Sequence, residues 1–388
     1  MSKLEELIAQ LCPNGVERKS IGDICDICRG RVMSKDYISE NKGEYPVYSS
    51  QTENNGELGR IATFDFDGEY LSWTTDGANA GTVFYRNGKF SVTNVCGLLK
   101  VKNDGLLTKY LYYTLNAEAP NHVNSGMGNP KLMSNVMAKI TIPIPPLPIQ
   151  EEIVRILDAF TELTAELTAE LTARRKQYEY YASNLIERSS NDLVPMAELA
   201  NFVYGYTDKA SDVGDARFIR ITDITEQGCL NMQNAKYISL NNEAKKSLLS
   251  KGDLVMARTG ATFGKTLYFD SDEPSAYASF LIKIIPDKKR LNNRFYWHFT
   301  KTPLYWEQAN KLVSTGGQPQ FNTPALKEVK IPLPPLEEQK RIVAILDRFD
   351  TLCNDISAGL PAEIEGRRKQ YEYYRDKLLT FKEKEKQR

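Results

Sequence analysis

Few side chains in this 388-residue sequence could perform catalysis or hold a metal. Cys25 and Cys28 have the spacing of half a zinc site, but a structural zinc needs four ligands. The sequence has no second cysteine pair at that spacing and only two histidines, His122 and His298. We therefore interpret both cysteines as small residues of a strand. Two distant histidines also disfavour a Ser/His/Asp site, so we expect no catalytic residue and no bound metal.

A glycine-rich segment has some features of a phosphate-binding loop. Gly260 and Gly264 precede Lys265, but three residues separate these glycines where a phosphate-binding loop has four. Gly77 and Gly81 occupy the corresponding place earlier in the chain, and no lysine follows them. The pattern predicts a backbone turn that occurs twice rather than a nucleotide site.

An acidic cluster is the remaining candidate for chemistry. Asp65, Asp67 and Glu69 could hold the metal ion of a nuclease. However, FDFDGEY alternates like a strand, Asp67-Gly68 is typical of a turn, and the later part of the chain has no corresponding acids. We interpret the three acids as solvated hairpin residues.

The composition is that of a folded protein: 41% of residues are apolar and 26% are charged. Fifty basic and fifty acidic residues balance, so any nucleic-acid binding must come from local patches. Six cysteines without disulfide spacing favour a reducing compartment. No apolar run is long enough to cross a membrane, and the start lacks a signal pattern, so we expect a cytoplasmic protein.

The sequence repeats itself. Residues 142–163 match residues 331–352 at 13 of 22 positions, and the octapeptide RRKQYEYY occurs at 174–181 and again at 367–374. Weaker matches pair Gly128-Asn129-Pro130 with Gly317-Gln318-Pro319, and LTKYLYYTL from Leu107 with LNNRFYWHF from Leu291. Each half therefore contains one variable region followed by one closely matched segment.

The matched segments begin with proline-rich stretches and continue as amphipathic helices. Their apolar residues recur every three or four positions, and Gly359 with Pro361 interrupts the second copy. Such a stripe needs another long helix as partner, and the nearest candidate is its own repeat, packed antiparallel. The alternative is two helices that each pack on their own domain.

The octapeptide contains more tyrosines and arginines than one helix-helix interface needs, which indicates a second, intermolecular surface. The helix-helix and partner interface is expected to include Ile153, Ile156, Leu157, Phe160, Leu163, Leu167, Arg174, Tyr178, Tyr181, Ile342, Ile345, Leu346, Phe349, Leu352, Arg367, Tyr371 and Tyr374.

These patterns predict an α+β protein with two homologous mixed α/β domains and a spacer of two long antiparallel helices. The predicted boundaries are 1–142 and 190–331 for the variable domains, and 143–189 and 332–388 for the helical regions.

Two similar scaffolds with different loop side chains suit recognition of two short elements of duplex DNA. Arginine pairs with guanine, asparagine or glutamine with adenine, and lysine with phosphate. The candidate DNA-binding residues in the first half are Arg31, Thr74, Thr75, Asp76, Asn79, Asn129 and Lys131. Those in the second half are Lys209, Arg220, Arg258, Thr262, Lys265, Gln318, Gln320 and Asn322.

The whole chain resembles the specificity (S) subunit of type I restriction-modification systems, through the PLPPL-x-EQ-x-RIV-x-ILD-x-F motif at 332–349. The TAEL repetition at 164–171 is similar to that of the type IC branch. The resemblance implies a non-catalytic subunit that binds a bipartite, asymmetric DNA sequence and two methyltransferase subunits, and through them the motor and restriction subunits. It also implies that S-adenosylmethionine, ATP and magnesium are bound by those partners, and that the complex methylates adenine N6 and cleaves unmethylated DNA.

The helical regions differ in length. Asp158 and Arg174 are 16 positions apart, whereas Asp347 and Arg367 are 20 apart, a difference of one TAEL unit. Four residues of continuous helix add about 6 Å and about 40° of rotation. Our hypothesis is that this length sets the separation of the two DNA elements.

Two other functions stay open at this point: a stand-alone nuclease or nucleoside-triphosphate hydrolase, and a coiled-coil adaptor for proteins.

Overall fold

The computed structural model describes residues 3–126, 128–314, 316–355 and 358–384. The chain divides into two compact units: unit 1 comprises Met1–Glu166 and Glu365–Arg388, and unit 2 comprises Leu167–Ile364. Each unit thus combines one variable region with part of both helical regions. Among the described residues, no helix is long and apolar enough to span a membrane.

Unit 1 contains two four-stranded sheets. In the first, the order β2-β9-β6-β7 is antiparallel throughout, and in the second, β4-β3-β8-β5, only β3 and β8 are parallel. β1 and β10 form a separate antiparallel pair. The strands are β1 (Glu17–Ser20), β2 (Cys25–Arg29), β3 (Lys42–Tyr48), β4 (Glu57–Ile61), β5 (Phe66–Asp67), β6 (Tyr70–Thr74), β7 (Val83–Arg86), β8 (Lys89–Val92), β9 (Cys96–Val101) and β10 (Thr141–Ile144). The shorter helices are α1 (Lys3–Leu11), α2 (Ile21–Ile24), α3 (Lys35–Glu40), α4 (Thr108–Glu118) and α5 (Ser134–Met137).

Unit 2 repeats this topology. Its sheet β12-β18-β15-β16 has the pairing pattern of β2-β9-β6-β7, and β13 pairs antiparallel with β14 and parallel with β17, as β3 does with β4 and β8. β11 pairs with β19 as β1 does with β10. The strands are β11 (Leu193–Pro195), β12 (Ala200–Tyr204), β13 (Ala216–Ile219), β14 (Tyr237–Ile238), β15 (Leu254–Ala257), β16 (Thr266–Tyr268), β17 (Ser275–Tyr277), β18 (Leu281–Pro286) and β19 (Lys330–Pro332). The shorter helices are α7 (Asn293–Phe299), α8 (Pro303–Leu312) and α9 (Thr323–Glu328). The predicted duplication of a mixed α/β module is confirmed.

The first helical region forms one long helix, α6 (Leu147–Glu187), of 41 residues. Its first half buries Ile149, Ile153 and Leu157 in the core of unit 1, together with residues of α4 and the strands. Its second half buries Tyr178, Ala182 and Ile186 in the core of unit 2. The matched segment thus forms part of the hydrophobic core of both units.

The second helical region forms two helices, so the interruption predicted at Gly359 and Pro361 is present and the expected second long helix is not. Five residues separate the end of α10 (Leu336–Asn354) from the start of α11 (Leu360–Leu379). A Cβ on Gly359 would lie 2.5 Å from the Thr351 carbonyl oxygen, so only glycine fits at this position. Pro361 lacks an amide hydrogen and fits the first turn of α11.

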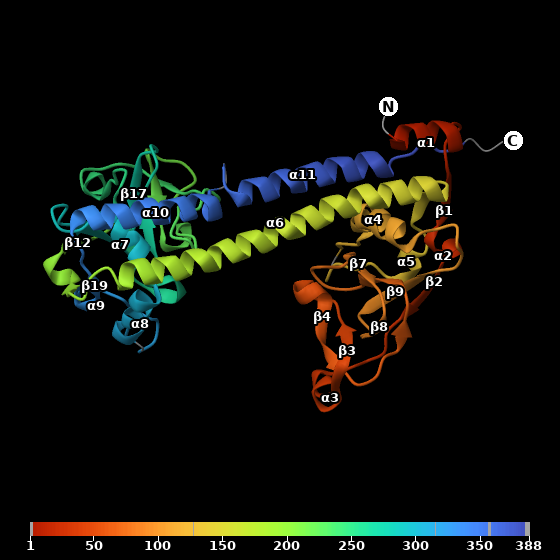
Figure 1. Ribbon diagram of the computed structural model, residues 1–388, viewed down its shortest axis with the longest axis horizontal. Helices are drawn as coiled ribbons and strands as arrows, with labels where there is room; N and C mark the ends of the chain where they lie inside the picture. The colour runs from red at the N-terminus through yellow and green to blue at the C-terminus, as the bar shows by residue number, and fades with distance from the viewer. Residues whose placement is uncertain (1–2, 127, 315, 356–357, 385–388) are drawn as a thin grey trace. The chain divides into compact units, whose positions relative to one another are not determined.

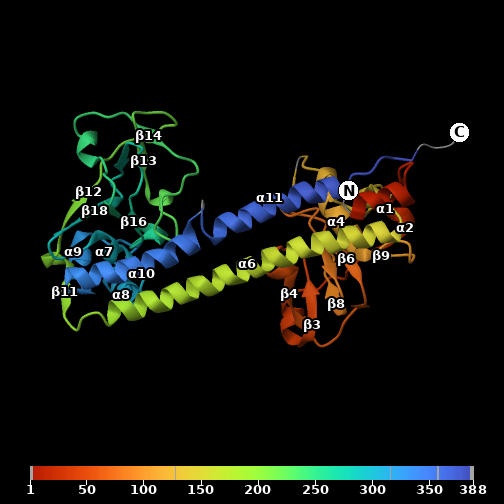
Figure 2. The same cartoon turned by 45° about the horizontal axis from the view of Figure 1, so that its top comes forward.

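Aromatic stacking joins α6 to the C-terminal helices inside each unit. In unit 1, α6 lies beside α11, and in unit 2 α10 begins beside the end of α6, so that the two run antiparallel (Figures 1 and 2). In unit 1 the Phe160 and Tyr374 rings stack at 5.5 Å, and in unit 2 the Tyr181 and Phe349 rings stack at 5.4 Å. The alternative, in which each helix packs only on its own domain, is therefore wrong.

Candidate nucleic-acid interface

Two loops in each unit are joined by the same backbone hydrogen bonds. We call residues 74–82 and 257–265 the glycine loops, and residues 129–133 and 318–322 the second loops. In unit 1 the Gly77 amide donates to the Pro130 carbonyl at 3.0 Å, and the Leu132 amide donates to the Thr75 carbonyl at 3.0 Å. The equivalent bonds of unit 2 run from Gly260 to Pro319 at 3.0 Å and from Phe321 to Arg258 at 2.7 Å. One scaffold therefore presents the loop side chains of both units.

Four glycines allow the tight turns of the glycine loops. Gly77, Gly81, Gly260 and Gly264 all have positive φ, between 70° and 98°, which disfavours any residue with a side chain. In both loops the second glycine donates its amide to the last residue of the preceding strand, Thr74 in unit 1 and Ala257 in unit 2. The prediction of a shared backbone turn is confirmed, and the lysine after the second turn has no counterpart in the first.

In unit 1 the glycine loop and the second loop bring four of the predicted residues together. Asp76 and Lys131 form a backbone bridge, and their charged groups lie 3.9 Å apart. Asn79 and Asn129 are exposed on the same pair of loops.

The other predicted residues of unit 1 make contacts inside the protein. Thr74 and Thr75 are buried, and their hydroxyls donate to the carbonyls of Asn79 and Val95, so they shape the loop rather than project from it. Arg31 is exposed at another loop and donates to the Asp65 carboxylate at 3.0 Å and to the Tyr37 hydroxyl at 3.3 Å.

In unit 2 three predicted residues form a connected polar chain. The Arg258 Nη1 group donates to Asn322 Oδ1 at 3.0 Å, and Asn322 Nδ2 donates to Gln320 Oε1 at 3.0 Å. Gln318 is exposed in the same second loop, and Thr262 is half-buried in the glycine loop. These five residues lie on the joined loops.

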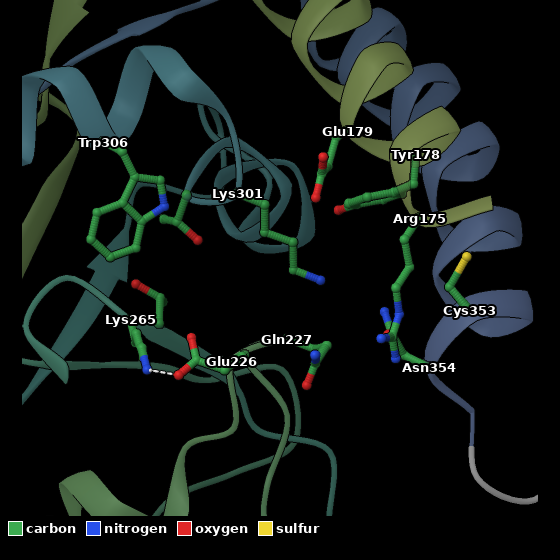
Figure 3. Close-up of a pocket in the computed structure, with 13 residues that line it drawn as sticks. Arg175, Tyr178, Glu179, Glu226, Gln227, Lys265, Lys301, Trp306, Cys353 and Asn354 are labelled. Atoms are coloured by element: carbon green, nitrogen blue, oxygen red, sulfur yellow. Dashed lines mark hydrogen bonds and ion pairs between the residues drawn. The ribbon is translucent and has the colours of Figure 1, made fainter. Parts of the chain in front are cut away.

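Of the three remaining predictions in unit 2, Arg220 and Lys209 lie outside the joined loops, and Lys265 is the last residue of the glycine loop. Arg220 makes two hydrogen bonds of 2.9 Å to the Asp223 carboxylate, and Lys209 is exposed in another loop. The Lys265 ammonium is 15% exposed and pairs with Glu226 at the wall of a cavity of about 270 Å³ (Figure 3). Because both Arg220 and Lys265 are paired with carboxylates, they are less available to DNA than the sequence suggested.

The other sequence candidates for chemistry make local contacts. Asp65 pairs with Arg31, Asp67 lies in the short strand β5, and Glu69 accepts from the Tyr85 hydroxyl at 2.6 Å. Cys25 and Cys28 lie in strand β2, as interpreted, and burial raises the pKa of Cys25 to about 12. Within the described parts of the chain, no three histidine, cysteine or acidic side chains come close enough to hold a metal.

Comparison with known proteins decides the family. Residues 13–174 and 192–366 each match the model of the type I restriction modification DNA specificity domain. The chain belongs to this family. We call the two matched segments the first and second specificity domains, and both joined loop pairs lie within them. DNA target recognition in a type I restriction-modification system is the function that this family carries out.

Relatives and solved structures agree with this assignment. A putative type I specificity subunit of Mycoplasma pneumoniae is 36% identical over 371 residues, which are 94% of this chain and 98% of that protein. The type I restriction enzyme MpnII specificity subunit of the same organism is 50% identical over 46% of this chain and 56% of its own length. A crystal structure of the type I restriction-modification system S subunit from M. genitalium has the same fold, with a TM-score of 0.61, 17% identity, and coverage of 94% of this chain and 96% of that one.

In each specificity domain a buried glutamine near the start of α6 or α10 binds the segment that precedes α4 or α7. The Gln150 side chain accepts from the Leu107 amide at 2.9 Å and donates to the Gly105 and Pro145 carbonyls. In the second domain Gln339 accepts from the Asn292 amide at 2.9 Å and donates to the Arg290 and Pro334 carbonyls. Both glutamines are fully buried.

The glutamine contacts correct one detail of the repeat. Because the two glutamines bind the amides of Leu107 and Asn292, these two residues are equivalent. The alignment of LTKYLYYTL with LNNRFYWHF predicted from the sequence is therefore wrong by one residue. The sequence is ambiguous here because Leu106 and Leu107 are both leucine, and Leu106 is the buried counterpart of Leu291.

A carboxylate on each helix makes the second attachment. Asp158 accepts from Lys109 and from the Tyr113 hydroxyl, both at 2.6 Å. Its counterpart Asp347 accepts from Arg294 at 2.7 Å and from His298 at 2.8 Å.

In the second domain the carboxylate belongs to a buried network. The Tyr178 hydroxyl of α6 lies 2.8 Å from His298 Nδ1. Since the Asp347 carboxylate only accepts, His298 Nε2 carries the proton and Nδ1 accepts from Tyr178. Burial lowers the pKa of His298 to about 4 and that of Lys301, which pairs with Asp350, to about 8. The network links α6, α7 and α10.

The predicted helix interface residues fall into three groups, and their role toward partners stays a prediction. Those buried in the cores or along α6 are Ile153, Leu157, Leu167, Tyr178, Ile342 and Leu346. Those half-buried are Ile156, Phe160, Leu163, Arg174, Ile345, Phe349, Arg367 and Tyr371. Those exposed are Tyr181, Leu352 and Tyr374.

Proposed function

We propose that this chain recognises a bipartite, asymmetric duplex DNA target, with one half bound by each specificity domain. The proposal is supported by the joined loops, which occur once in each specificity domain. Equivalent backbone positions hold Lys131 in the first domain and Gln320 in the second, and these side chains differ in charge and hydrogen-bonding capacity. Since base edges are distinguished by such groups, two unequal half-sequences are expected.

The test is to express the chain with a type I methyltransferase subunit, purify the complex and map methylated adenines in the DNA of the host. We expect one sequence made of two defined parts with an unspecified gap. Methylation without a defined sequence, or at one uninterrupted sequence, contradicts the proposal.

The helices are proposed to bind two methyltransferase subunits. Tyr180 and Tyr373 occupy the same place in the two octapeptides and are 64% and 63% exposed, which supports equivalent docking positions. Replacing either tyrosine by alanine should weaken binding of one methyltransferase subunit, and the double variant should lose both. Phe64→Ala, an exposed aromatic residue of a first-domain loop, is the matched control and should retain both. Two bound subunits in the double variant would contradict this assignment.

Catalysis is proposed to reside in the partners. Adenine N6 methylation would use S-adenosylmethionine bound by the methyltransferase subunits, and motor and restriction subunits joining through them would supply ATP- and magnesium-dependent cleavage. This chain would contribute sequence recognition and assembly, without a catalytic residue of its own.

A further inference from the structure

Five positions are equivalent in the two specificity domains and lie around the joined loops. The hydrogen bonds of the second loops match Lys131 with Gln320, and Met133 follows with Asn322. Thr75 corresponds to Arg258, and their amides donate to the carbonyls of Val95 and Phe280, both at 3.1 Å.

The fifth equivalent position is the last residue of an edge strand. Arg29 ends β2 and Tyr204 ends β12, and in each case the next residue, Gly30 or Gly205, donates its amide to the first residue of the neighbouring strand. The sequence alone did not single out Arg29, Val95, Met133, Tyr204 or Phe280, because only strand pairing places them beside the loops.

In the second domain these positions form a polar chain beside two exposed aromatic rings. The Arg258 guanidinium lies 5.4 Å from the Tyr204 ring and 5.5 Å from the Phe280 ring. Tyr204 is 45% exposed and Phe280 is 53% exposed. An aromatic surface of this kind beside amide side chains is typical of a binding surface.

The polar chain fixes the orientation of the Gln320 amide. Arg258 can only donate, so Asn322 turns its oxygen to Arg258 and its nitrogen to Gln320. Gln320 therefore uses its oxygen toward Asn322, keeps a second lone pair on that oxygen, and is exposed. Among the described residues, no group accepts a hydrogen bond from Gln320 Nε2.

An oriented amide and an exposed apolar ring, which Asn322 and Arg258 connect, match the two partners of an A·T base pair in the major groove. Adenine presents N7 as acceptor and N6 as donor to a glutamine, and thymine presents a methyl group to an apolar side chain. We infer that Gln320 binds an adenine edge and that Phe280 contacts a thymine methyl group in the half-sequence bound by the second domain. This inference rests on the proposed DNA-recognition function.

The first domain has different chemistry at the same positions. Arg29 and Lys131 replace Tyr204 and Gln320, and both are exposed. The Lys131 ammonium lies 3.9 Å from the Asp76 carboxylate, a longer contact than the carboxylate pairs of Arg220 and Lys265, and its side chain is 51% exposed. Arg29 contacts the Met133 sulfur at 3.5 Å and the Ser134 hydroxyl at 3.3 Å, both neutral groups. Arginine and lysine favour the O6 and N7 atoms of guanine. The two domains should therefore differ at this position of their half-sequences, with guanine in the first and adenine in the second.

The first test uses the complex with its methyltransferase partner. After the wild-type target is mapped, Gln320→Ala should reduce discrimination at one A·T pair of one half-sequence, by about fivefold to about 150-fold. Gln320→Lys, which introduces the first-domain residue, should shift the preference at that pair toward G·C. Lys131→Ala is the matched control and should alter only the other half. Unchanged base preference in both Gln320 variants would overturn the inference.

The second test probes the methyl group directly. Each thymine of the second-domain half-sequence is replaced in turn by deoxyuridine, which lacks only that methyl group. Wild-type complex should bind one such duplex more weakly, by about fourfold, whereas Phe280→Ala should bind both duplexes equally. Val95→Ala, at the equivalent position of the first domain, should retain the wild-type difference. Wild-type affinity unchanged at every thymine would overturn the Phe280 contact. Absence of any defined wild-type target would instead contradict the proposed function.

Discussion

Phe160 stacks on Tyr374 with ring centroids 5.5 Å apart and an interplanar angle of 25°. Phe349 and Tyr181, the residues that correspond to these two in the other copy of the repeat, stack at 5.4 Å and 25°. The matched segments thus form the same contact twice, once in each unit.

This stacking should contribute measurably to stability. Aromatic pairs add about 0.5–1.5 kcal/mol beyond the area that they bury. A double-mutant cycle with Phe160→Leu and Tyr374→Leu should give a coupling energy in that range, and the cycle at Phe349 and Tyr181 should give the same value. Urea denaturation provides the measurement. Additive single-variant effects in both cycles would show that the ring contacts are not energetically linked.

The buried glutamines should be intolerant of apolar replacement. Gln339→Leu keeps the side-chain size but leaves the Asn292 amide and the carbonyls of Arg290 and Pro334 without their hydrogen bonds. An unsatisfied buried group costs about 1–3 kcal/mol, so the variant should lose at least that much stability. Gln10→Leu, at an exposed position of α1, should stay within about 0.5 kcal/mol of wild type. Equal unfolding midpoints for Gln339→Leu and Gln10→Leu would contradict this role.

His298 should make the stability of the second domain depend on pH. Its pKa falls from 6.5 to about 4 because it is buried, so between these values the unfolded chain binds the proton more tightly. Stability from the neutral imidazole is complete above pH 6.5 and is lost as the pH falls toward 4, by up to about 3 kcal/mol. Denaturation can be followed by the fluorescence of the adjacent Trp297 between pH 8 and 4. His298→Gln should be less stable at pH 8 but should show a shallower decline. An identical decline in both proteins would exclude His298 as its source.

The sequence was sufficient to predict the duplication, the glycine turns and the helix break, because each depends on local residue types. It could not show which loop side chains are paired within the protein. Lys265 and Arg220 have suitable chemistry for DNA, but the fold brings Glu226 and Asp223 close to them as ion-pair partners. The sequence did not single out Phe280 and Tyr204 because their place beside Arg258 arises from strand pairing rather than from sequence spacing.

The length of α6 should control the spacing of the DNA target. Inserting one TAEL unit after Leu171 adds about 6 Å of helix and about 40° of rotation. Since one base pair spans about 3.4 Å, we expect the unspecified gap to grow by one or two base pairs while both half-sequences stay the same. Methylome sequencing of the variant measures the gap directly. An unchanged gap would refute the hypothesis that helix length sets it.

If one recognition module was duplicated, each copy should recognise half of the target independently. This independence can be measured from the methylome of a complex in which residues 190–331 are exchanged for the corresponding domain of another specificity subunit. We expect one half-sequence to change and the half bound by the first domain to be retained. A simultaneous change of both half-sequences would show that the two copies do not recognise DNA independently.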